Sequence, residues 1–382
     1  MSSQPSATST AAAETPLRRI PFVALDAQFA EERTAVLAAV EAVLDSGMLV
    51  GGDPIGALEE RLAKQVGAAH VVALNSGTDA LILGLRALGI GPGDEVITPP
   101  NSFVASTAAI VACGAVPVFA DVLPDQNIDP AAVEAAITPR TRAIMPVHLT
   151  GRVCDMDAIG GIAERHGLTV VEDAAQAFGS SWRGRPAGSF GDIGCFSAHP
   201  LKNLNATGDA GFVATDDAGV AERLRLLRNH GLADRDTVVS WGTVSRMDTL
   251  HAAVLLERLD RVPSVVARRR ANARRYQEKL DPSTVFAPPC RQEEFNTFHT
   301  FVVQLDRRDA AQRFLAERGI GTAIHYPVPI HLQPAARELG KGPGSFPVTE
   351  RQAGRILSLP IHQFLSPDDI DYVVDQLEAF FA

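Results

Sequence analysis

The sequence VVEDAAQ, residues 170–176, is followed along the chain by GCFSAHPLKN, residues 194–203, and by GDAG, residues 208–211. One apolar run therefore ends at an acidic pair, and a second ends in a loop that carries Lys202 between Pro200 and Gly208. In open α/β sheets, ligands bind beyond the carboxyl ends of the parallel strands. These segments predict an α/β fold with Asp173 and Lys202 at one edge of its sheet.

An acid and an amine placed in this way are the two groups that pyridoxal phosphate needs. A carboxylate against the pyridine nitrogen keeps it protonated, and a lysine amine of lowered pKa forms a Schiff base with the aldehyde. Each residue also has an ordinary interpretation: Asp173 as the N-cap of a helix from Ala174, and Lys202 as a solvated surface lysine. The loop flanked by Pro200 and Gly208 holds few other charges, which favours the cofactor.

Apolar runs alternate with amphipathic stretches, which predicts a large domain with a mostly parallel, seven-stranded sheet. The expected strands are 70–74, 95–98, 116–120, 143–147, 169–172, 193–196 and 212–215. The expected helices are 79–88, 102–113, 130–137, 156–166, 247–259 and 263–280. Strands at 299–305 and 321–326 and helices at 309–318 and 367–381 then indicate a smaller C-terminal α+β domain. We expect a disordered tail over residues 1–19, the large domain over 20–264 and the small one over 265–382.

Composition narrows the class of protein. The 382 residues exceed one ordinary domain, and a net charge of -10 argues against a nucleic-acid partner. The arginines at 268–270 and 274–275 are expected to form a solvated helix face. Four scattered cysteines without a C-x-x-C pair indicate neither a metal site nor a disulfide framework. No apolar run reaches the ~20 residues that a membrane span requires, so we expect a cytoplasmic protein that does not contact the membrane.

From about Pro21 to the C-terminus, the chain resembles the DegT/DnrJ/EryC1/StrS family of PLP-dependent aminotransferases. The resemblance rests on several motifs in one order: NSGTDAL (75–81), GPGDEVI (91–97), PVHLTG (146–151), EDAAQ (172–176), the lysine loop, HYP (325–327) and PIH (329–331). It implies the aspartate aminotransferase-like fold type I of PLP-dependent transferases. It also implies a homodimer whose active sites lie at the subunit interface.

The resemblance assigns a role to each motif around the cofactor. It implies that Lys202 is the Schiff-base lysine and that Asp173 contacts the pyridine nitrogen. The turn before the helix at 79–88 would bind the phosphate at the helix N-terminus, although a plain N-cap is the alternative there. The remaining cofactor-binding residues implied are Gly77, Thr78 and Ser197 at the phosphate, Phe103 stacked on the ring and Gln176 near the phenolic oxygen. Without the resemblance, Ser197 could cap a turn, Phe103 could belong to the core, and Gln176 could be an ordinary helix residue.

Four further residues are substrate-side candidates: His199, His325, Tyr326 and His331. A lone histidine is more often structural, so these rest on the resemblance. One segment departs from the family pattern. Many members have Gly-x-Asn-x-Arg, whose asparagine reaches the phosphate of the neighbouring subunit, whereas residues 242–246 read GTVSR with Val244 in its place. Thr243, Ser245 and Arg246 are the candidates to replace the asparagine, or the phosphate has one ligand fewer.

The implied function is a ping-pong transamination. An amino group would move from glutamate or glutamine to the keto group of a sugar, most often nucleotide-linked, with Lys202 as general acid and base. A keto-cyclitol or another natural-product intermediate is the alternative acceptor. A PLP- or PMP-dependent sugar dehydratase is disfavoured, because known dehydratases of this family carry histidine in place of the lysine. A non-catalytic regulatory protein is disfavoured because the lysine and aspartate are both present.

Overall fold

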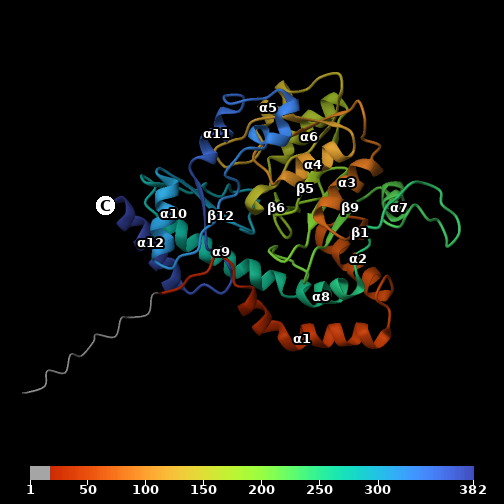
Figure 1. Ribbon diagram of the computed structural model, residues 1–382, viewed down its shortest axis with the longest axis horizontal. Coiled ribbons are helices and arrows are strands. Elements are labelled where there is room, and N and C mark those ends of the chain that lie inside the picture. The colour runs from red at the N-terminus through yellow and green to blue at the C-terminus, as the bar shows by residue number, and fades with distance from the viewer. Residues whose placement is uncertain (1–17) are drawn as a thin grey trace, which may run out of the picture.

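The computed structural model describes residues 18–382, and its centre is a seven-stranded sheet (Figure 1). The strand order is β1-β9-β8-β5-β4-β2-β3. Strand β9 runs antiparallel to β1 and β8, and all other neighbours are parallel. The strands are β1 (His70–Leu74), β2 (Glu95–Thr98), β3 (Val116–Phe119), β4 (Thr141–Ile144), β5 (Thr169–Asp173), β8 (Ile193–Ser197) and β9 (Gly211–Thr215).

The predicted mostly parallel seven-stranded sheet is confirmed. The largest shift is in β4, which ends at Ile144 although 143–147 was expected. Pro146 has no N–H to donate to the ladder, and beyond it Val147 pairs with Asp173 through an isolated bridge only. Regular pairing of β4 therefore stops before His148, although single backbone bonds still join Pro146 and His148 to Asp173.

Helices cover both faces of the sheet because successive side chains along a strand point to opposite faces. On one face, Val72 and Leu74 pack with α3 (Gly77–Ala87), α4 (Val104–Ala112) and α7 (Ala218–Leu227). On the other, Val71 and Ala73 pack with α2, α6 and α8. The helices of this second face are α2 (Asp53–Val66), α5 (Pro130–Ala135), α6 (Met156–His166) and α8 (Thr249–Leu259). Helix α1 (Leu25–Ser46) lies below them in Figure 1 and packs against α8.

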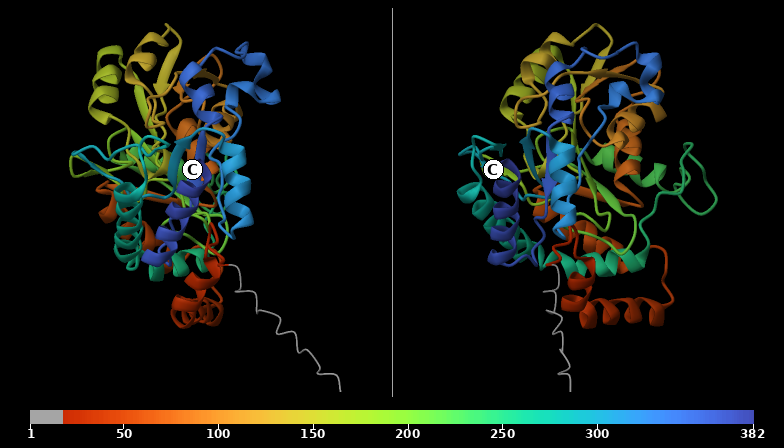
Figure 2. Two further views of the ribbon diagram at one scale, coloured as in Figure 1. Left: turned by 90° about the vertical axis from the view of Figure 1, so that its left-hand side faces the viewer. Right: turned by 60° about the vertical axis from the view of Figure 1, so that its left-hand side comes forward.

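A second, smaller sheet of order β10-β12-β13 lies at the far end of helix α9 (Figure 2). Its core also contains Ile20, which pairs with Ile320. Its elements are α9 (Val262–Lys279), β10 (Val285–Phe286), β12 (Phe301–Leu305), α10 (Arg308–Glu317), β13 (Ile356–Leu359) and α12 (Pro367–Phe381). The predicted domain boundary at residue 265 falls inside α9 and stays a prediction. Residues 1–17 of the predicted tail lie outside the described residues.

The predicted strand at 321–326 is wrong. Only Ala323 pairs there, in one bridge to Ser358, and the rest of the segment is irregular. The unpredicted strand β13 takes the place beside β12 instead. The other elements not expected from the sequence are the helices α1, α2, α7 and α11 (Pro347–Ala353), the strands β6 (Ser181–Trp182), β7 (Arg185–Pro186), β10 and β11 (Glu294–Phe295), and the 3-10 turns η1 (Leu149–Gly151), η2 (Ile330–Leu332) and η3 (Pro334–Leu339).

Candidate active site

A cavity of about 410 Å³ lies at the carboxyl ends of β1, β5 and β8. It brings together segments that are far apart in the sequence. All of the predicted site residues but His331 line it: Gly77, Thr78, Phe103, Asp173, Gln176, Ser197, His199, Lys202, His325 and Tyr326.

Asp173 ends strand β5 with its carboxylate buried at the cavity floor, where 4% of the residue is exposed. Its Oδ2 accepts a 2.7 Å hydrogen bond from Ser106 Oγ, and Oδ1 accepts a 3.2 Å bond from the Ala175 N–H. Burial raises the pKa of Asp173, and these two bonds act against that shift. No helix begins at Ala174, so the N-cap interpretation of Asp173 is wrong.

Lys202 lies in the loop between β8 and β9, which a hydrogen bond from its own N–H to the His199 carbonyl tightens. Its side chain lines the cavity. Burial lowers the pKa of Lys202 to about 8, while the charge of Asp173 opposes the shift. An amine of that pKa is partly unprotonated near neutral pH, so it can act as a nucleophile or as a base.

The N-terminus of α3 faces the cavity beside the end of β8. Ser76 caps the helix by accepting from the Asp79 N–H, and Gly77 and Thr78, the first two residues of the helix, line the cavity. Gly77 lies so close to β8 that an added Cβ would stand 2.6 Å from Ser197 Cβ. The two hydroxyls and the helix N-terminus form a place where a phosphate is favourable.

Gln176 is held in a fixed orientation. Its Oε1 accepts a 2.7 Å bond from the Thr150 N–H, so its amide N–H groups point to the cavity, where Tyr326 Oη is 3.4 Å away. Burial raises the pKa of Tyr326 to about 12, so the phenol stays protonated. The Phe103 ring lies 5.6 Å from the Tyr326 ring and is 53% exposed, so Phe103 does not belong to the core.

The sequence model of the DegT/DnrJ/EryC1/StrS aminotransferase family matches residues 30–378. The chain belongs to this family. It is 45% identical to the erythromycin biosynthesis sensory transduction protein EryC1 of Saccharopolyspora erythraea, over 94% of this chain and 99% of that protein. It is 45% identical to the dTDP-3-amino-3,4,6-trideoxy-alpha-D-glucose transaminase of Streptomyces venezuelae, over 95% and 96%. The crystal structure of S. venezuelae DesV in complex with a ketimine intermediate superposes with a TM-score of 0.93 at 44% identity, covering 95% and 98%.

These matches confirm the predicted family, its fold and an aminotransferase activity. No helix within residues 18–382 is long and apolar enough to cross a membrane.

The residues of this DegT/DnrJ/EryC1/StrS aminotransferase that line the cavity without having been predicted include the polar Ser106, Asp209 and His299. Ser106 lies in the first turn of α4, three residues after the N-cap Phe103, and nothing in the alanine-rich sequence of that helix marks it. Asp209 stands in the GDAG segment that ends the lysine loop. His299 carries no local signal, because it comes to the cavity from the segment before β12.

Behind Asp173, a buried pair supports the floor of the cavity. Glu172 Oε2 accepts a 2.8 Å bond from His148 Nε2, while His148 Nδ1 accepts from the Cys154 N–H. Glu172 also accepts from the N–H groups of Gly188, Phe190 and Gly191. The acid beside Asp173 thus holds the loop before β8 in place.

His331 lies apart from the cavity. It is buried against Phe119 and Phe346, and its Nε2 is 3.1 Å from Glu350 Oε1. Ile330 and Leu339 complete this small cluster, and His331 does not line the cavity.

In the segment 242–246, which departs from the family pattern, two residues already form hydrogen bonds within this chain. Ser245 is fully buried, and its hydroxyl donates to Asn75 Oδ1 at 3.1 Å. Arg246 donates to Asn229 Oδ1. Thr243 and Val244 are exposed, so among the candidates Thr243 is the one whose hydroxyl is free to reach another subunit.

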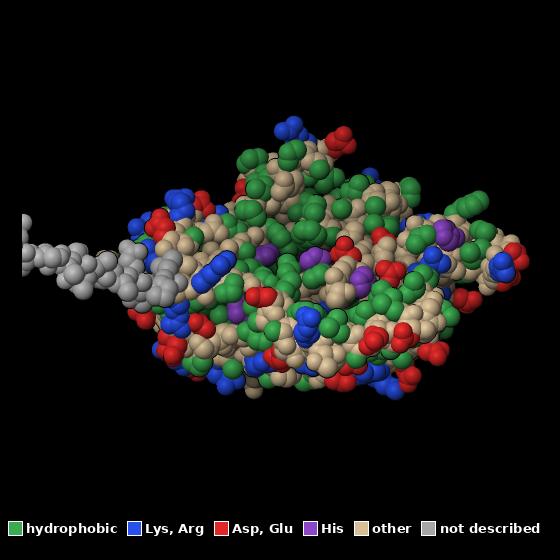
Figure 3. Space-filling view, turned by 60° about the horizontal axis from the view of Figure 1, so that its bottom comes forward, with side chains coloured by type: hydrophobic (Ala, Val, Ile, Leu, Met, Phe, Trp, Pro, Cys, Tyr) green, Lys and Arg blue, Asp and Glu red, His purple; other side chains and the backbone are tan. Residues whose placement is uncertain are grey.

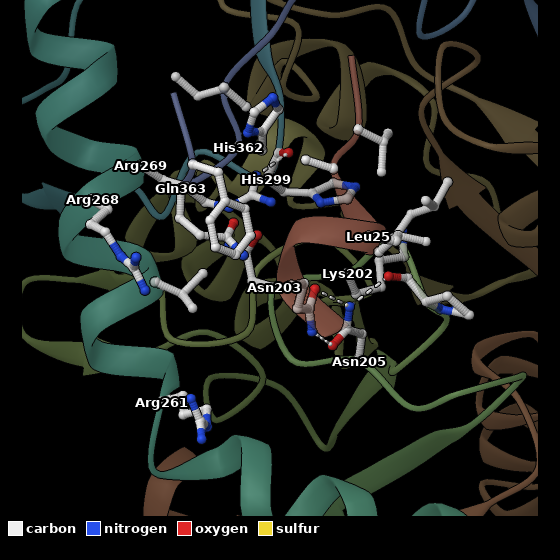
Figure 4. A pocket seen from close by; sticks show the side chains of 18 of the residues that line it. Leu25, Lys202, Asn203, Asn205, Arg261, Arg268, Arg269, His299, His362 and Gln363 are labelled. Atoms are coloured by element: carbon white, nitrogen blue, oxygen red, sulfur yellow. Dashed lines mark hydrogen bonds between the residues drawn. The ribbon is translucent and has the colours of Figure 1, made fainter. Parts of the chain in front are cut away.

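The arginine cluster on α9 corrects the expectation of a solvated face. Arg269 lines a second cavity, which Figure 4 shows from close by. Arg270 donates to the Asn296 carbonyl and Arg275 pairs with Asp371. The spacing of the arginines in the sequence did not reveal that α9 lies between the two sheets. Because of this position, these arginines contact other parts of the protein.

Proposed function

We propose that this aminotransferase moves an amino group from glutamate or glutamine to the keto group of a nucleotide-linked sugar, with pyridoxal phosphate as the carrier. The observation that carries the proposal is the presence of Lys202 and Asp173 in one cavity with the N-terminus of α3. The S. venezuelae relative, named for a dTDP-linked 3-amino sugar, supports a sugar nucleotide as the acceptor class.

The residues of the cavity fit this cofactor. Asp173 is a buried carboxylate whose Oδ1 has capacity for one more donor beside the Ala175 N–H, which suits a protonated pyridine nitrogen. Thr78, Ser197 and the first turn of α3 suit the phosphate. Gln176 would donate to the phenolic oxygen, and Phe103 offers a ring to stack on the pyridine. When bound, pyridoxal phosphate supplies an electron sink for the carbanion formed at the substrate carbon.

Residues of the cavity have separate roles in the proposed reaction. Lys202 supplies the amine that anchors the cofactor, and once displaced its Nζ takes the proton from the reacting carbon of the donor. With a pKa of about 8, Lys202 both accepts and returns this proton near neutral pH. With the cofactor bound, the Asp173 carboxylate would keep the pyridine nitrogen protonated, because an opposite charge favours the charged form of a neighbouring group. Gln176 donates to Tyr326 Oη at 3.4 Å, which joins these two side chains at the wall of the cavity.

We also propose a homodimer, with a second copy covering exposed apolar side chains near the cavity mouth. Hydrophobic side chains gather on the middle of the face in Figure 3. A single surface this apolar is typical of a protein interface. The exposed residues concerned are Phe29, Leu37, Leu44, Met48, Leu49, Val50, Phe103, Val104, Trp241 and Val244.

The function is tested by absorption spectra and by turnover. The purified protein, loaded with pyridoxal phosphate, is mixed with glutamate or glutamine and then with a panel of dTDP-linked ketosugars, UDP-linked ketosugars and keto-cyclitols. We expect loss of the visible band with a donor, and amine transfer to a nucleotide-linked sugar, neither of which Lys202→Ala performs. Transfer to a cyclitol alone would overturn the proposed acceptor, and turnover by Lys202→Ala would overturn the mechanism.

A further inference from the structure

A second cavity, of about 100 Å³, adjoins the first at Lys202. It lies between the segment 22–32, helices α8 and α9 and the loop 361–364 (Figure 4). Leu201, Lys202, His299 and His325 line both cavities. A small molecule in the second cavity would therefore contact Lys202.

Most of the arginines on its wall are already paired. Arg258 pairs with Glu32, and Arg261 and Arg268 both pair with Glu31. Arg269 has no carboxylate within salt-bridge distance among residues 18–382. Both acidic residues of the cavity, Glu31 and Glu32, thus already pair with other arginines, and Arg269 is the guanidinium without a carboxylate partner among the described residues.

Arg269 makes only backbone contacts. Its Nη1 donates to the carbonyls of Phe298 and His299, at 3.3 and 3.1 Å. Its Nε and the Nδ1 of His299 are buried, and within the described part of the chain neither has a hydrogen-bond partner. Burial lowers the pKa of Arg269 to about 10, so it stays cationic at neutral pH. Burial also lowers the pKa of His299 well below its usual value, with Lys202 and Arg269 adding to the shift.

A buried guanidinium Nε without a hydrogen-bond partner, on a cation that no carboxylate pairs with, is a feature of an anion site. The size of the cavity limits the anion. A drug-sized ligand fills about 300–1,000 Å³, so about 100 Å³ admits a short chain and no nucleotide. Guanidinium groups bind carboxylates through two parallel hydrogen bonds.

We propose that Arg269 binds the α-carboxylate of the amino donor, an inference that rests on the proposed aminotransferase function. The α-amino group of the donor must reach the place of Lys202 Nζ, and its α-carboxylate is one carbon away. Glutamate and glutamine share this carboxylate, so one arginine serves both. His299, neutral and next to Arg269, lines the path between the carboxylate and the amine.

The test compares Arg269→Met with the matched control Arg268→Met in the loaded enzyme. Arg268 lies on the same cavity wall, but Glu31 already neutralises it. We measure KM for glutamate, glutamine and the ketosugar, and the Kd of 2-methyl-L-glutamate from the absorption change. That probe has no α-hydrogen, so it binds without being turned over. We expect KM for both donors and the Kd to rise about 10- to 100-fold in Arg269→Met, with KM for the ketosugar unchanged.

Three results would overturn the assignment: donor affinity unchanged in folded Arg269→Met, a loss for glutamate but not for glutamine, or an equal loss in Arg268→Met. If Arg269→Met does not fold, Arg269→Lys keeps the charge without the planar fork, and a KM for both donors equal to that of the parent would overturn it as well. The parent enzyme separates this question from the proposed function. A parent that accepts neither donor contradicts the aminotransferase proposal itself, whereas an active parent with an unaffected variant contradicts only the role of Arg269.

Discussion

The Ser106 hydroxyl donates a 2.7 Å hydrogen bond to Asp173 Oδ2. The bond joins helix α4 to the end of strand β5 and ties up one carboxylate oxygen, which leaves Oδ1 toward the cavity. It also stabilises the charged form of an acid whose burial favours the neutral form. Ser106 is thus a positioning residue for the group proposed to face the pyridine nitrogen.

Replacing Ser106 with alanine should weaken catalysis without unfolding the protein. Loss of the bond removes stabilisation of the carboxylate and raises the pKa of Asp173 further, so the acidic limb of the rate profile should move to higher pH. We expect kcat/KM to fall about 3- to 10-fold, as for one lost hydrogen bond to a charged group. Ser102→Ala is the control, because that buried hydroxyl donates to the Phe103 carbonyl instead. Equal pH profiles for both variants would contradict the role of Ser106.

The reactivity of Lys202 should follow its lowered pKa. An ammonium is unreactive and a free amine attacks an aldehyde, so uptake of pyridoxal phosphate by cofactor-free protein should accelerate as pH rises through about 8. A solvated lysine would respond near pH 10.4 instead, roughly two units higher. Stopped-flow absorbance over pH 6–10 measures the midpoint, with Lys202→Ala as the blank. A midpoint near the value for a free lysine would show that the side chain is solvated.

Gly77→Ala should lose cofactor affinity. The new Cβ would stand 2.6 Å from Ser197 Cβ, so the helix N-terminus and the end of β8 must separate. We expect the Kd for pyridoxal phosphate to rise at least about 10-fold, since phosphate contacts depend on both segments. Gly56→Ala in α2 is the control, because nothing lies within 4 Å of its Cβ. A double variant with Ser197→Gly should recover melting temperature but not cofactor affinity.

The buried pair Glu32–Arg258 should support the lysine loop from below. Arg258 donates to Glu32 and, through Nη1, to the carbonyls of Asn205 and Ala206. Glu32→Gln leaves a buried guanidinium uncompensated and should lower the free energy of unfolding by about 3 kcal/mol. Glu31→Gln, at an exposed pair beside it, should change that free energy by about 1 kcal/mol or less. Urea unfolding compares the two, and equal losses would contradict the importance of the buried pair.

The proposed dimer should break when charge enters its apolar surface. Leu44 is 57% exposed on α1, and glutamate there would be buried without a partner in the dimer. We expect Leu44→Glu to halve the mass measured by light scattering and to weaken cofactor binding. Phe286→Glu, at an exposed hydrophobic of the small sheet, should leave the mass unchanged. A monomeric parent would contradict the proposal directly.

Much of the large sheet follows from the sequence because each strand is a short apolar run bounded by turn residues. Asp173 and Lys202 were predictable for the same reason, since each follows a buried strand. Ser106 and Arg269 were not. Ser106 lies in an alanine-rich helix and Arg269 in an arginine cluster, and both sequences are typical of an ordinary helix face. Ser106 gains its contact only because α4 lies beside the end of β5. Arg269 gains its contacts only because α9 lies between the two sheets. The segment 321–326 shows the opposite error, because its apolar residues suit a strand whose place β13 occupies.

The antiparallel placement of β9 has a consequence for synthesis of the chain. Because β9 runs antiparallel between β8 and β1, the lysine loop starts and ends on the cavity side of the sheet. At the end of this loop, Gly211 lies against the backbone of Ser76. The amine and the turn at the start of α3 are therefore joined through a strand that leaves the ribosome last of the seven. A nascent chain that stops before residue 211 has every predicted cofactor residue from Gly77 to Lys202, yet it lacks the strand that holds them in register. Cofactor capture should consequently report completion of the sheet during translation.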